Sequence, residues 1–345
     1  MKTIPLIRAS APKRFALFLE YIGAPVESMW SRACLPMRAL EQGESLVPLH
    51  HALQFVEHAA RLEDLPHLGI LAARHLEFSA DSEFARRISR ARTLFDAVAT
   101  AQTLVRAHNS GERYWLVQEG DRVRVCRRMS PDMIPSRQAD LFTLTEMIDV
   151  VRRFAGSDWR PEEVSTQSAG HEGLERVEAL SEARIACGRP ATSITLPRSF
   201  LPQPLIISGM PAPHRSAGAS ESDPWLASAP PPGFTDSVRA LVRSLLPLGS
   251  LEVEIAAEGA RMSVRSLQRR LTEEGTSFSR ILDDVRFAAA RGMLEGSDLK
   301  LIEIALELGY SDPAHFTRAF RRWTSVTPGM YRRMVPDAVR ERRSA

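Results

Sequence analysis

The sequence predicts two domains: an α+β domain, then an all-α domain in which a long helix joins two helix-turn-helix units. Three observations support this prediction. The chain has 345 residues, more than one ordinary domain of about 100–200 residues. A stretch rich in Pro, Ala, Ser and Gly lies at residues 211–233. The segment that follows it carries a helical apolar pattern that occurs twice.

The composition is that of a globular chain. It is 44% hydrophobic and 25% charged, which excludes a mainly disordered chain, a collagen and a disulfide scaffold. The cysteines Cys34, Cys126 and Cys187 lie far apart and form no CxxC pair, so we expect neither a structural zinc site nor a disulfide framework. No apolar run reaches the roughly 18–20 residues of a membrane span, and the N-terminus has no signal-peptide pattern. The expected location is the cytoplasm.

The Pro- and Ser-rich stretch predicts the domain boundary. It has almost no apolar periodicity, and only Trp225-Leu226 interrupts it. Such a segment buries too little surface to offset the entropy of ordering it, so residues 211–233 are interpreted as a linker. The alternative is a long loop inside one domain. The predicted domains are then 1–210 and 234–335, followed by a basic tail at 336–345.

The charge pattern points only weakly to a partner. The formal net charge is +3. Residues 234–345 contain 18 Lys+Arg against 15 Asp+Glu, and the rest of the chain contains 27 of each. Nearly all the basic residues are arginines, which suit planar contacts to phosphate and guanine. A GC-rich genome would also encode such a bias, so composition leaves both explanations open.

Helix and strand signals alternate in the N-terminal domain, which predicts an α+β fold. The expected strands are a hairpin at 114–126 with its turn at 119–121, and a late strand at 193–197. Helical patterns cover 15–22, a helix opening at Pro48, 84–107 and 142–154.

The C-terminal domain is predicted to be helical throughout. A first helix covers 234–246 and is ended by Pro247. Ser250 is the expected N-cap of the next helix, and Ser263 the N-cap of the one after the short break at 259–262. A long helix runs from about Phe278 to Leu294. The helix-turn-helix units are expected at about 250–272 and 299–323.

A shift of 49 residues superimposes the two units. It aligns Ile255-Ala256 with Ile304-Ala305, Ser263 with a second N-cap at Asp312, and Leu267 with Phe316. Pro313 is a favoured first helical residue after that cap. A recognition helix fits the major groove of DNA, and two on one rigid helix can occupy successive grooves about 34 Å apart.

Residues 250–334 resemble the DNA-binding domain of the AraC/XylS family of bacterial transcription regulators. The resemblance rests on the stretches 262–271, 274–278, 302–313 and 315–323, and on Thr327-Pro328 and Tyr331-Arg332. Two positions depart from the family pattern, because Arg261 and Ser325 stand where the family often has glycine.

The resemblance implies which residues would read DNA. The base-reading positions would be Arg265, Gln268 and Arg269 in the first recognition helix, and Ala314, His315 and Arg318 in the second. Ser263, Ser266 and Thr317 would contact phosphate. The alternative for each of them is a solvated surface side chain. Leu267, Phe316, Phe320 and Trp323 are interpreted as core.

The N-terminal domain resembles the arabinose-binding-like effector domain of the same family. The cues are Pro48-Leu49 and the stretches 69–74, 185–187 and 194–201. The resemblance implies a regulator of promoter DNA, more an activator than a repressor, that works with RNA polymerase, forms a homodimer and responds to a small-molecule effector. The effector and its binding residues stay unknown. The alternative is an N-terminal domain that binds a protein partner or only dimerises.

Catalytic chemistry has little support in the sequence. His50-His51 with Glu57 and His58 could suggest a metal, but adjacent helical histidines point about 100° apart. Cys126 beside two arginines is a weak redox candidate. Trp30, Tyr114 and Trp115 are either pocket residues or core. The cysteines lack the Pro-Cys-His-Arg setting of the methyl-transfer modules that some related proteins carry. We therefore expect no enzyme, no metal and no cofactor.

Overall fold

The computed structural model describes residues 3–78, 82–205, 223–249 and 251–334. The chain divides into two compact units. We call residues 5–33 and 39–230 the N-terminal unit. Residues 231–334, together with residues 3–4 and 34–38, form the C-terminal unit. No helix among the described residues is both long and apolar enough to cross a membrane.

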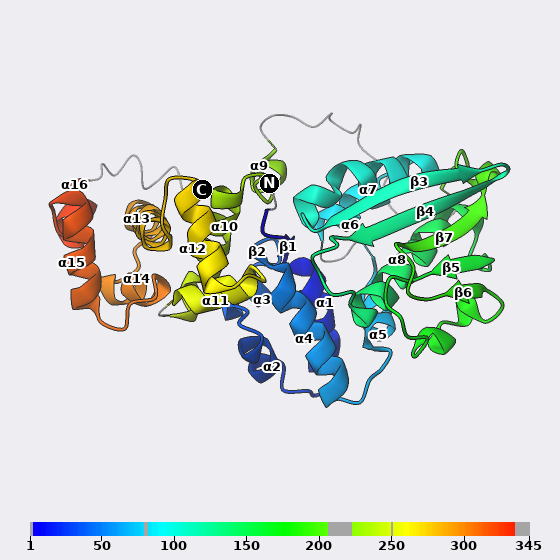
Figure 1. Cartoon of the computed structure of the whole chain (residues 1–345), viewed down its shortest axis with the longest axis horizontal. Coiled ribbons are helices and arrows are strands. Elements are labelled where there is room, and N and C mark those ends of the chain that lie inside the picture. Colours follow the sequence, from blue (N-terminus) through cyan, green and yellow to red (C-terminus); the bar gives the residue numbers. More distant parts are fainter. Residues whose placement is uncertain (1–2, 79–81, 206–222, 250, 335–345) are drawn as a thin grey trace. The chain divides into compact units, whose positions relative to one another are not determined.

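The helices and strands follow one another as Figure 1 shows. The helices up to residue 230 are α1 (Ser10–Tyr21), α2 (Val26–Arg32), α3 (Met37–Glu41), α4 (Leu49–Leu62), α5 (Leu68–His75), α6 (Glu83–Ser89), α7 (Leu94–His108), α8 (Arg137–Ala155) and α9 (Pro224–Ala227). The strands are β1 (Leu6–Arg8), β2 (Leu46–Pro48), β3 (Glu112–Glu119), β4 (Arg122–Met129), β5 (Glu163–Ser165), β6 (Arg184–Ala186) and β7 (Thr192–Pro197). The later helices are α10 (Phe234–Leu245), α11 (Val253–Gly259), α12 (Val264–Glu273), α13 (Phe278–Gly296), α14 (Leu301–Glu307), α15 (Pro313–Thr324) and α16 (Pro328–Met334).

The N-terminal unit has the predicted α+β fold. Its larger sheet has the strand order β3-β4-β7-β5-β6, in which only β5 and β6 are parallel. The predicted hairpin is confirmed, with Trp115 paired to Cys126 and a left-handed Gly120 in its turn. The late strand is confirmed as β7. The smaller β1–β2 sheet and the strands β5 and β6 are too short for an apolar pattern to reveal them.

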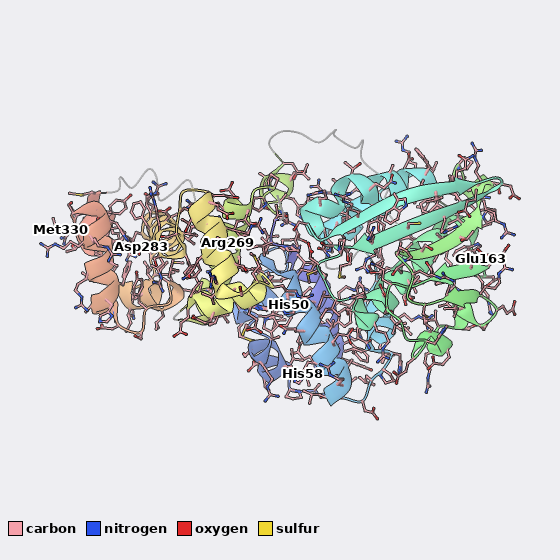
Figure 2. All side chains as sticks on the ribbon, viewed as in Figure 1. His50, His58, Glu163, Arg269, Asp283 and Met330 are labelled. Carbon is pink, nitrogen blue, oxygen red and sulfur yellow. The ribbon has the colours of Figure 1, made fainter. Side chains whose placement is uncertain are left out.

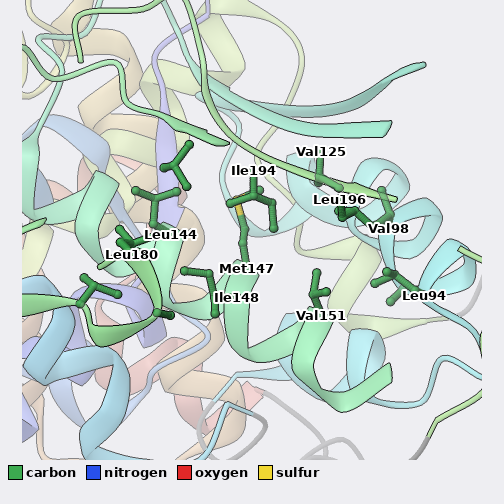
Figure 3. Close-up of a cluster of buried hydrophobic side chains, with 14 of the residues drawn as sticks. Leu94, Val98, Val125, Leu144, Met147, Ile148, Val151, Leu180, Ile194 and Leu196 are labelled. Atoms are coloured by element: carbon green, nitrogen blue, oxygen red, sulfur yellow. The ribbon is translucent and has the colours of Figure 1, made fainter. Parts of the chain in front are cut away.

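The main core of this unit lies between one face of the larger sheet and the helices α7 and α8. Val125 on β4 and Ile194 on β7 are cross-strand partners, so their side chains share that face. They meet Leu94 and Val98 of α7 and Met147 and Val151 of α8 (Figure 3). The side chains that alternate with them on the strands lie on the opposite face.

One helical prediction needs adjustment in this unit, and one helix contact requires a glycine. The pattern over 84–107 is divided between α6 and α7, because Thr93 pairs with Pro204 and its Oγ1 accepts a hydrogen bond from Asp96 N at 3.1 Å, which starts a new helix. Helix α5 packs closely on α8 at Gly69. A Cβ atom at Gly69 would lie 2.2 Å from the Gln138 carbonyl oxygen, so only glycine fits there.

Part of the predicted linker belongs to the N-terminal unit. Trp225 in α9 is 8% exposed and stacks between two guanidinium groups, with ring distances of 4.6 Å for Arg8 and 4.7 Å for Arg87. Its indole donates to Glu44 Oε2 at 2.7 Å, and Asp223 pairs with Arg87 at 2.6 Å. These contacts order a segment whose composition predicted a linker. Residues 211–222 and the predicted tail at 336–345 lie outside the described residues.

The C-terminal unit is helical, as predicted. Helix α10 buries Phe234, Val238 and Leu241, and α13 lies between the two helix-turn-helix pairs in the chain. The unit also includes residues from far upstream in the sequence. Ile4 is buried, and its backbone N–H donates to Ser237 Oγ at 3.0 Å. Leu35 is fully buried, and Arg38 pairs with Glu307 at 3.2 Å. Apolar periodicity gives no sign of such long-range contacts.

Candidate nucleic-acid interface

The first helix-turn-helix unit consists of α11 and α12. Ser263 caps α12 as predicted, since its Oγ accepts a hydrogen bond from Ser266 N at 3.2 Å. Leu267 and Leu271 are fully buried. The opposite face of α12 is exposed, and it carries the predicted base-reading residues Arg265, Gln268 and Arg269. Figure 2 labels Arg269 on this helix. The predicted N-cap Ser250 lies outside the described residues, and Glu252 occupies the N-cap position of α11.

The second unit consists of α14 and α15 and repeats this design. Asp312 Oδ1 accepts a hydrogen bond from Ala314 N at 2.8 Å, and Pro313 is the first helical residue. Phe316 and Phe320 are fully buried. The exposed face of α15 carries the other predicted base-reading residues, Ala314, His315 and Arg318. Both recognition helices therefore present polar side chains to solvent from a rigid apolar base.

The three predicted phosphate contacts are engaged locally in the structure. Ser263 Oγ donates to Ser266 Oγ at 2.9 Å while it caps α12. Thr317 Oγ1 donates to the Pro313 carbonyl at 2.9 Å. A phosphate oxygen is an acceptor, so the Ser263 and Thr317 hydroxyl groups would have to redirect their protons to bind one, whereas Ser266 Oγ only accepts, from Ser263. Ser266 and Thr317 are half-buried, whereas Ser263 is exposed.

The repeat has two registers, and the single 49-residue shift is wrong for the first helix of each unit. Helices α11 and α14 superimpose at a shift of 48, which pairs the buried Ala256-Ala257 with the buried Ile304-Ala305. Helices α12 and α15 superimpose at 49. The second turn is thus one residue longer. Burial decides the register, and spacing alone could not find that extra residue.

The two departures from the glycine pattern both lie in the left-handed region of backbone conformation. Arg261 has φ = 52° in the first turn, and Ser325 has φ = 65° at the C-terminal end of α15. A side chain costs energy in this region because its Cβ atom crowds the backbone. This explains why glycine would suit both positions, and it shows that the chain still adopts the turn without glycine.

We expect Ser325→Gly to stabilise the C-terminal unit by about 0.5–1 kcal/mol, since glycine favours the left-handed C-terminal position of a helix. Thermal unfolding of the full chain would measure the effect. The matched control is Ser311→Gly, because Ser311 is also an exposed serine beside an end of α15 but does not have a positive φ. That control should stabilise nothing. Equal effects of both changes would contradict the role assigned to φ.

Helix α13 supplies contacts that the sequence analysis missed. Arg286 Nε donates to the Leu308 carbonyl in the second turn at 3.0 Å, and its guanidinium stacks on Tyr310 at 4.5 Å. Asp283, labelled in Figure 2, accepts from Arg322 of α15 at 2.8 Å. These contacts hold the second unit on α13. The charged residues of α13 are visible in the sequence, but the partners of Asp283 and Arg286 lie more than 20 residues away in the chain.

The residues considered for other chemistry fall elsewhere. His50 and His58 lie near opposite ends of α4 (Figure 2), and the described residues contain no group of three or more metal-ligating side chains. Burial raises the pKa of the Cys126 thiol to about 11, so the weak redox hypothesis for a low-pKa cysteine is wrong. Trp30 is core and packs edge-on against Phe55 at 4.9 Å. Tyr114 lines a cavity, which is described below.

Comparisons with known proteins agree with this architecture. Residues 256–334 match the family model described as a helix-turn-helix domain. Residues 23–205, more than half of the chain, match the model described as the arabinose-binding domain of AraC transcription regulator, N-term. The chain therefore belongs to the AraC family of transcription regulators. It combines a helix-turn-helix DNA-binding domain with an arabinose-binding-like N-terminal domain.

Several individual proteins share part of the sequence. The ornithine utilization regulator of Pseudomonas aeruginosa is 46% identical over 81 residues, which are 24% of each protein. The HTH-type transcriptional regulator VirS of Mycobacterium tuberculosis is 38% identical over 29% of each protein. The transcriptional activator RhrA of Rhizobium meliloti is 32% identical over 30% of this chain and 33% of that protein. The chain thus spans only a quarter to a third of the length of these relatives.

Solved structures of related regulators also align with the chain. The transcriptional regulator CdpR from Pseudomonas aeruginosa aligns over 93% of this chain and 97% of that one, with 19% identity and a TM-score of 0.38. The DNA-binding domain of AdpA, solved in complex with a target DNA, aligns over 32% of this chain and 96% of that one. Its identity is 31% and its TM-score 0.27.

Proposed function

We propose that the protein binds a specific promoter sequence as a homodimer, activates transcription together with RNA polymerase, and is controlled by a small-molecule effector bound in its N-terminal unit. One observation carries the DNA-binding part of the proposal. Two capped helices, α12 and α15, each expose a polar face to solvent and bury their apolar face in the C-terminal unit.

The helix that joins the two pairs supports simultaneous binding to two grooves. Helix α13 has 19 residues, which corresponds to a length of about 28 Å at 1.5 Å per residue. Successive major grooves on one side of DNA are about 34 Å apart. A rigid element of this length between the two units is suited to that spacing.

The exposed residues have the chemistry for base reading. Arg265, Arg269 and Arg318 can each offer two donors to the O6 and N7 atoms of guanine, and Gln268 can pair with adenine. His315 can donate to a base edge, and the methyl group of Ala314 can contact the methyl group of thymine. Arg269 also lies 3.7 Å from Glu273, an exposed pair that DNA would have to displace. Ser263, Ser266 and Thr317 complete the proposed surface as phosphate contacts.

Effector control requires two arrangements of the protein that differ in their affinity for the effector. An effector switches the protein only if it binds one arrangement of the domains more tightly than the other. The name of RhrA, a transcriptional activator, supports activation in this chain. The arabinose-binding-like model supports a small-molecule site without identifying the molecule.

We expect Arg318→Ala to weaken binding to the preferred DNA site by about 10- to 100-fold, because one bidentate contact to guanine is worth about 1–3 kcal/mol. Selection from random DNA with the full chain would define the preferred site, and gel-shift titrations would compare the variants. Arg291→Ala is the matched control, because Arg291 is exposed on α13 and pairs with Glu295 at 3.5 Å. Unchanged specificity in Arg318→Ala would remove this residue from the reading surface.

A further inference from the structure

The N-terminal unit contains a cavity with two adjoining lobes of about 90 and about 60 Å³. Residues common to both lobes are Phe78, Phe84, Tyr114, Thr143 and Glu146. An engineered protein cavity of about 150 Å³ binds benzene. The two lobes together therefore have about the volume that one six-membered ring needs.

The smaller lobe is almost entirely apolar. It is lined by core residues that Figure 3 labels: Leu94, Val98, Val125, Met147, Val151 and Ile194. Alanines at 97 and 101 on α7 leave the space that larger side chains would occupy. The larger lobe lies towards α1 and α4 and is lined by more polar groups. A ligand with an apolar part and a polar head fits this distribution.

The polar groups at the junction of the lobes have unused hydrogen-bonding capacity. Among the described residues, the hydroxyl groups of Tyr114 and Thr143 make no hydrogen bond, and the buried Nδ1 atom of His108 has no partner. Burial lowers the pKa of His108 to about 3, so this ring is neutral. Burial also raises the pKa of Glu146 to about 7, against the opposing effect of Arg14.

The arginines of the cavity are already ion-paired with carboxylates. Arg14 Nη2 donates to the carbonyl oxygens of Ala73 at 2.6 Å and Leu76 at 2.7 Å, at the C-terminal end of α5. Arg14 lies 3.4 Å from Glu146. Arg127 pairs with both Glu112 and Asp140. Both guanidinium groups are paired with carboxylates, although the Nε atoms of Arg14 and Arg127 have no hydrogen-bond partner. The paired carboxylates disfavour an incoming anion, whereas a hydrogen-bond donor would find Glu146 and the two hydroxyl groups.

We propose that this cavity is the effector site, and that its ligand is a small molecule with an apolar part of about one ring and a hydrogen-bond-donating head, an ammonium or hydroxyl group, that binds Glu146. The regulatory role of this site rests on the proposed function, whereas the binding site itself is argued from the cavity alone.

Helix α6, which lines the cavity, also binds the segment that leads out of the N-terminal unit. Phe84 and Ala85 of α6 line the cavity. One turn further along α6, Arg87 binds Asp223 and stacks on Trp225. A ligand that shifts α6 would therefore act on the start of the connection to the C-terminal unit. Trp225 is a positioning residue in this proposal.

The test uses four ligands that share a benzene ring: benzylamine, benzyl alcohol, benzoate and toluene. Calorimetric titration of the full chain should show that benzylamine or benzyl alcohol binds at least about tenfold more tightly than benzoate or toluene, the size expected for one hydrogen bond to a charged group. Glu146→Gln should remove about that tenfold preference for benzylamine. The matched control Glu178→Gln changes a carboxylate whose side chain is 80% exposed and should alter nothing.

A second variant tests the apolar part of the site. Ala101→Leu places additional carbon atoms in the smaller lobe and should abolish binding of all four compounds. Equal affinities for the four ligands, or affinities that neither Glu146→Gln nor Ala101→Leu changes, would overturn the site. So would the absence of any binding to the donor-bearing compounds.

The regulatory part has its own readout. Trp225→Ala should keep ligand binding but lose the effect of the ligand on DNA affinity, and retention of both would overturn the coupling through α6. Gel shifts without ligand separate the two proposals. If the full chain binds DNA specifically but binds none of the four ligands, the effector site is wrong and the proposed DNA-binding function is unaffected. If the full chain binds the ligands but shows no DNA specificity, the proposed function is wrong and the binding site is unaffected.

Discussion

Gly309→Ala is expected to destabilise the C-terminal unit by about 2–5 kcal/mol, which combines a left-handed backbone cost with overpacking. Gly309 has φ = 74° in the second helix-turn-helix turn. A Cβ atom there would lie 2.1 Å from the carbonyl oxygen of Gly249 and 3.2 Å from that of Leu246. Because these are backbone atoms, no side chain can rotate away to make room. Loss of DNA binding should follow from the displaced α15.

Gly275→Ala is the matched control for this change. Gly275 has a nearly identical φ of 76°, but a Cβ atom there would meet nothing within 4 Å. It should show the conformational cost alone, about 1–2 kcal/mol. Thermal unfolding of both variants measures the difference, which is the steric contribution of the contact with Gly249. If the two variants unfold together, the close contact has no energetic weight.

Asp140→Ala is expected to destabilise the N-terminal unit by about 3–5 kcal/mol, the usual cost of breaking a buried ion pair from one side. Asp140 and Arg127 are each 1% exposed. Asp140 Oδ1 accepts from Arg127 at 3.0 Å and from Thr192 Oγ1 at 2.7 Å, and Oδ2 accepts from Ser168 N at 2.8 Å. Although burial lowers the pKa of Arg127, Glu112 and Asp140 together raise it above its usual value. The variant therefore keeps a charged guanidinium with one carboxylate.

Two comparisons make this result specific. Asp140→Asn keeps an acceptor oxygen and should cost less than Asp140→Ala. Glu178→Ala breaks an exposed pair with Arg160 at 3.2 Å and should cost no more than about 1 kcal/mol. Denaturant unfolding of the full chain, followed through the transition of the N-terminal unit, gives all three values. A cost for Asp140→Ala no larger than that for Glu178→Ala would show that the buried network contributes little.

The exposed polar faces of α12 and α15 could be predicted in detail because their signals are local. A cap such as Ser263 or Asp312 lies within three residues of the N–H group that it satisfies, and the apolar face of α12 or α15 recurs every three or four residues. The exposure of Arg265, Gln268, Arg269, Ala314, His315 and Arg318 follows from that periodicity. Whether each of them contacts a base stays a prediction.

The cavity could not be predicted because it has no local signal. Tyr114, Thr143 and Glu146 come from a strand and a helix about 30 residues apart in the chain, and the cavity that they line exists only once the sheet and α8 are packed together. The same reason applies to Trp225. The composition of the surrounding segment predicts a linker, but Trp225 is held in place by Arg8 and Arg87, which lie more than 130 residues upstream.

Local sequence signals were enough to predict the family, the α+β and all-α fold classes and the polar faces of the recognition helices. These depend on caps, turns and periodicities that act within about ten residues. The extra residue in the second turn, the inclusion of residues 34–38 in the C-terminal unit and the cavity became visible only in the three-dimensional structure. These features depend on burial and on contacts between packed elements, and such contacts leave no periodic pattern in the chain.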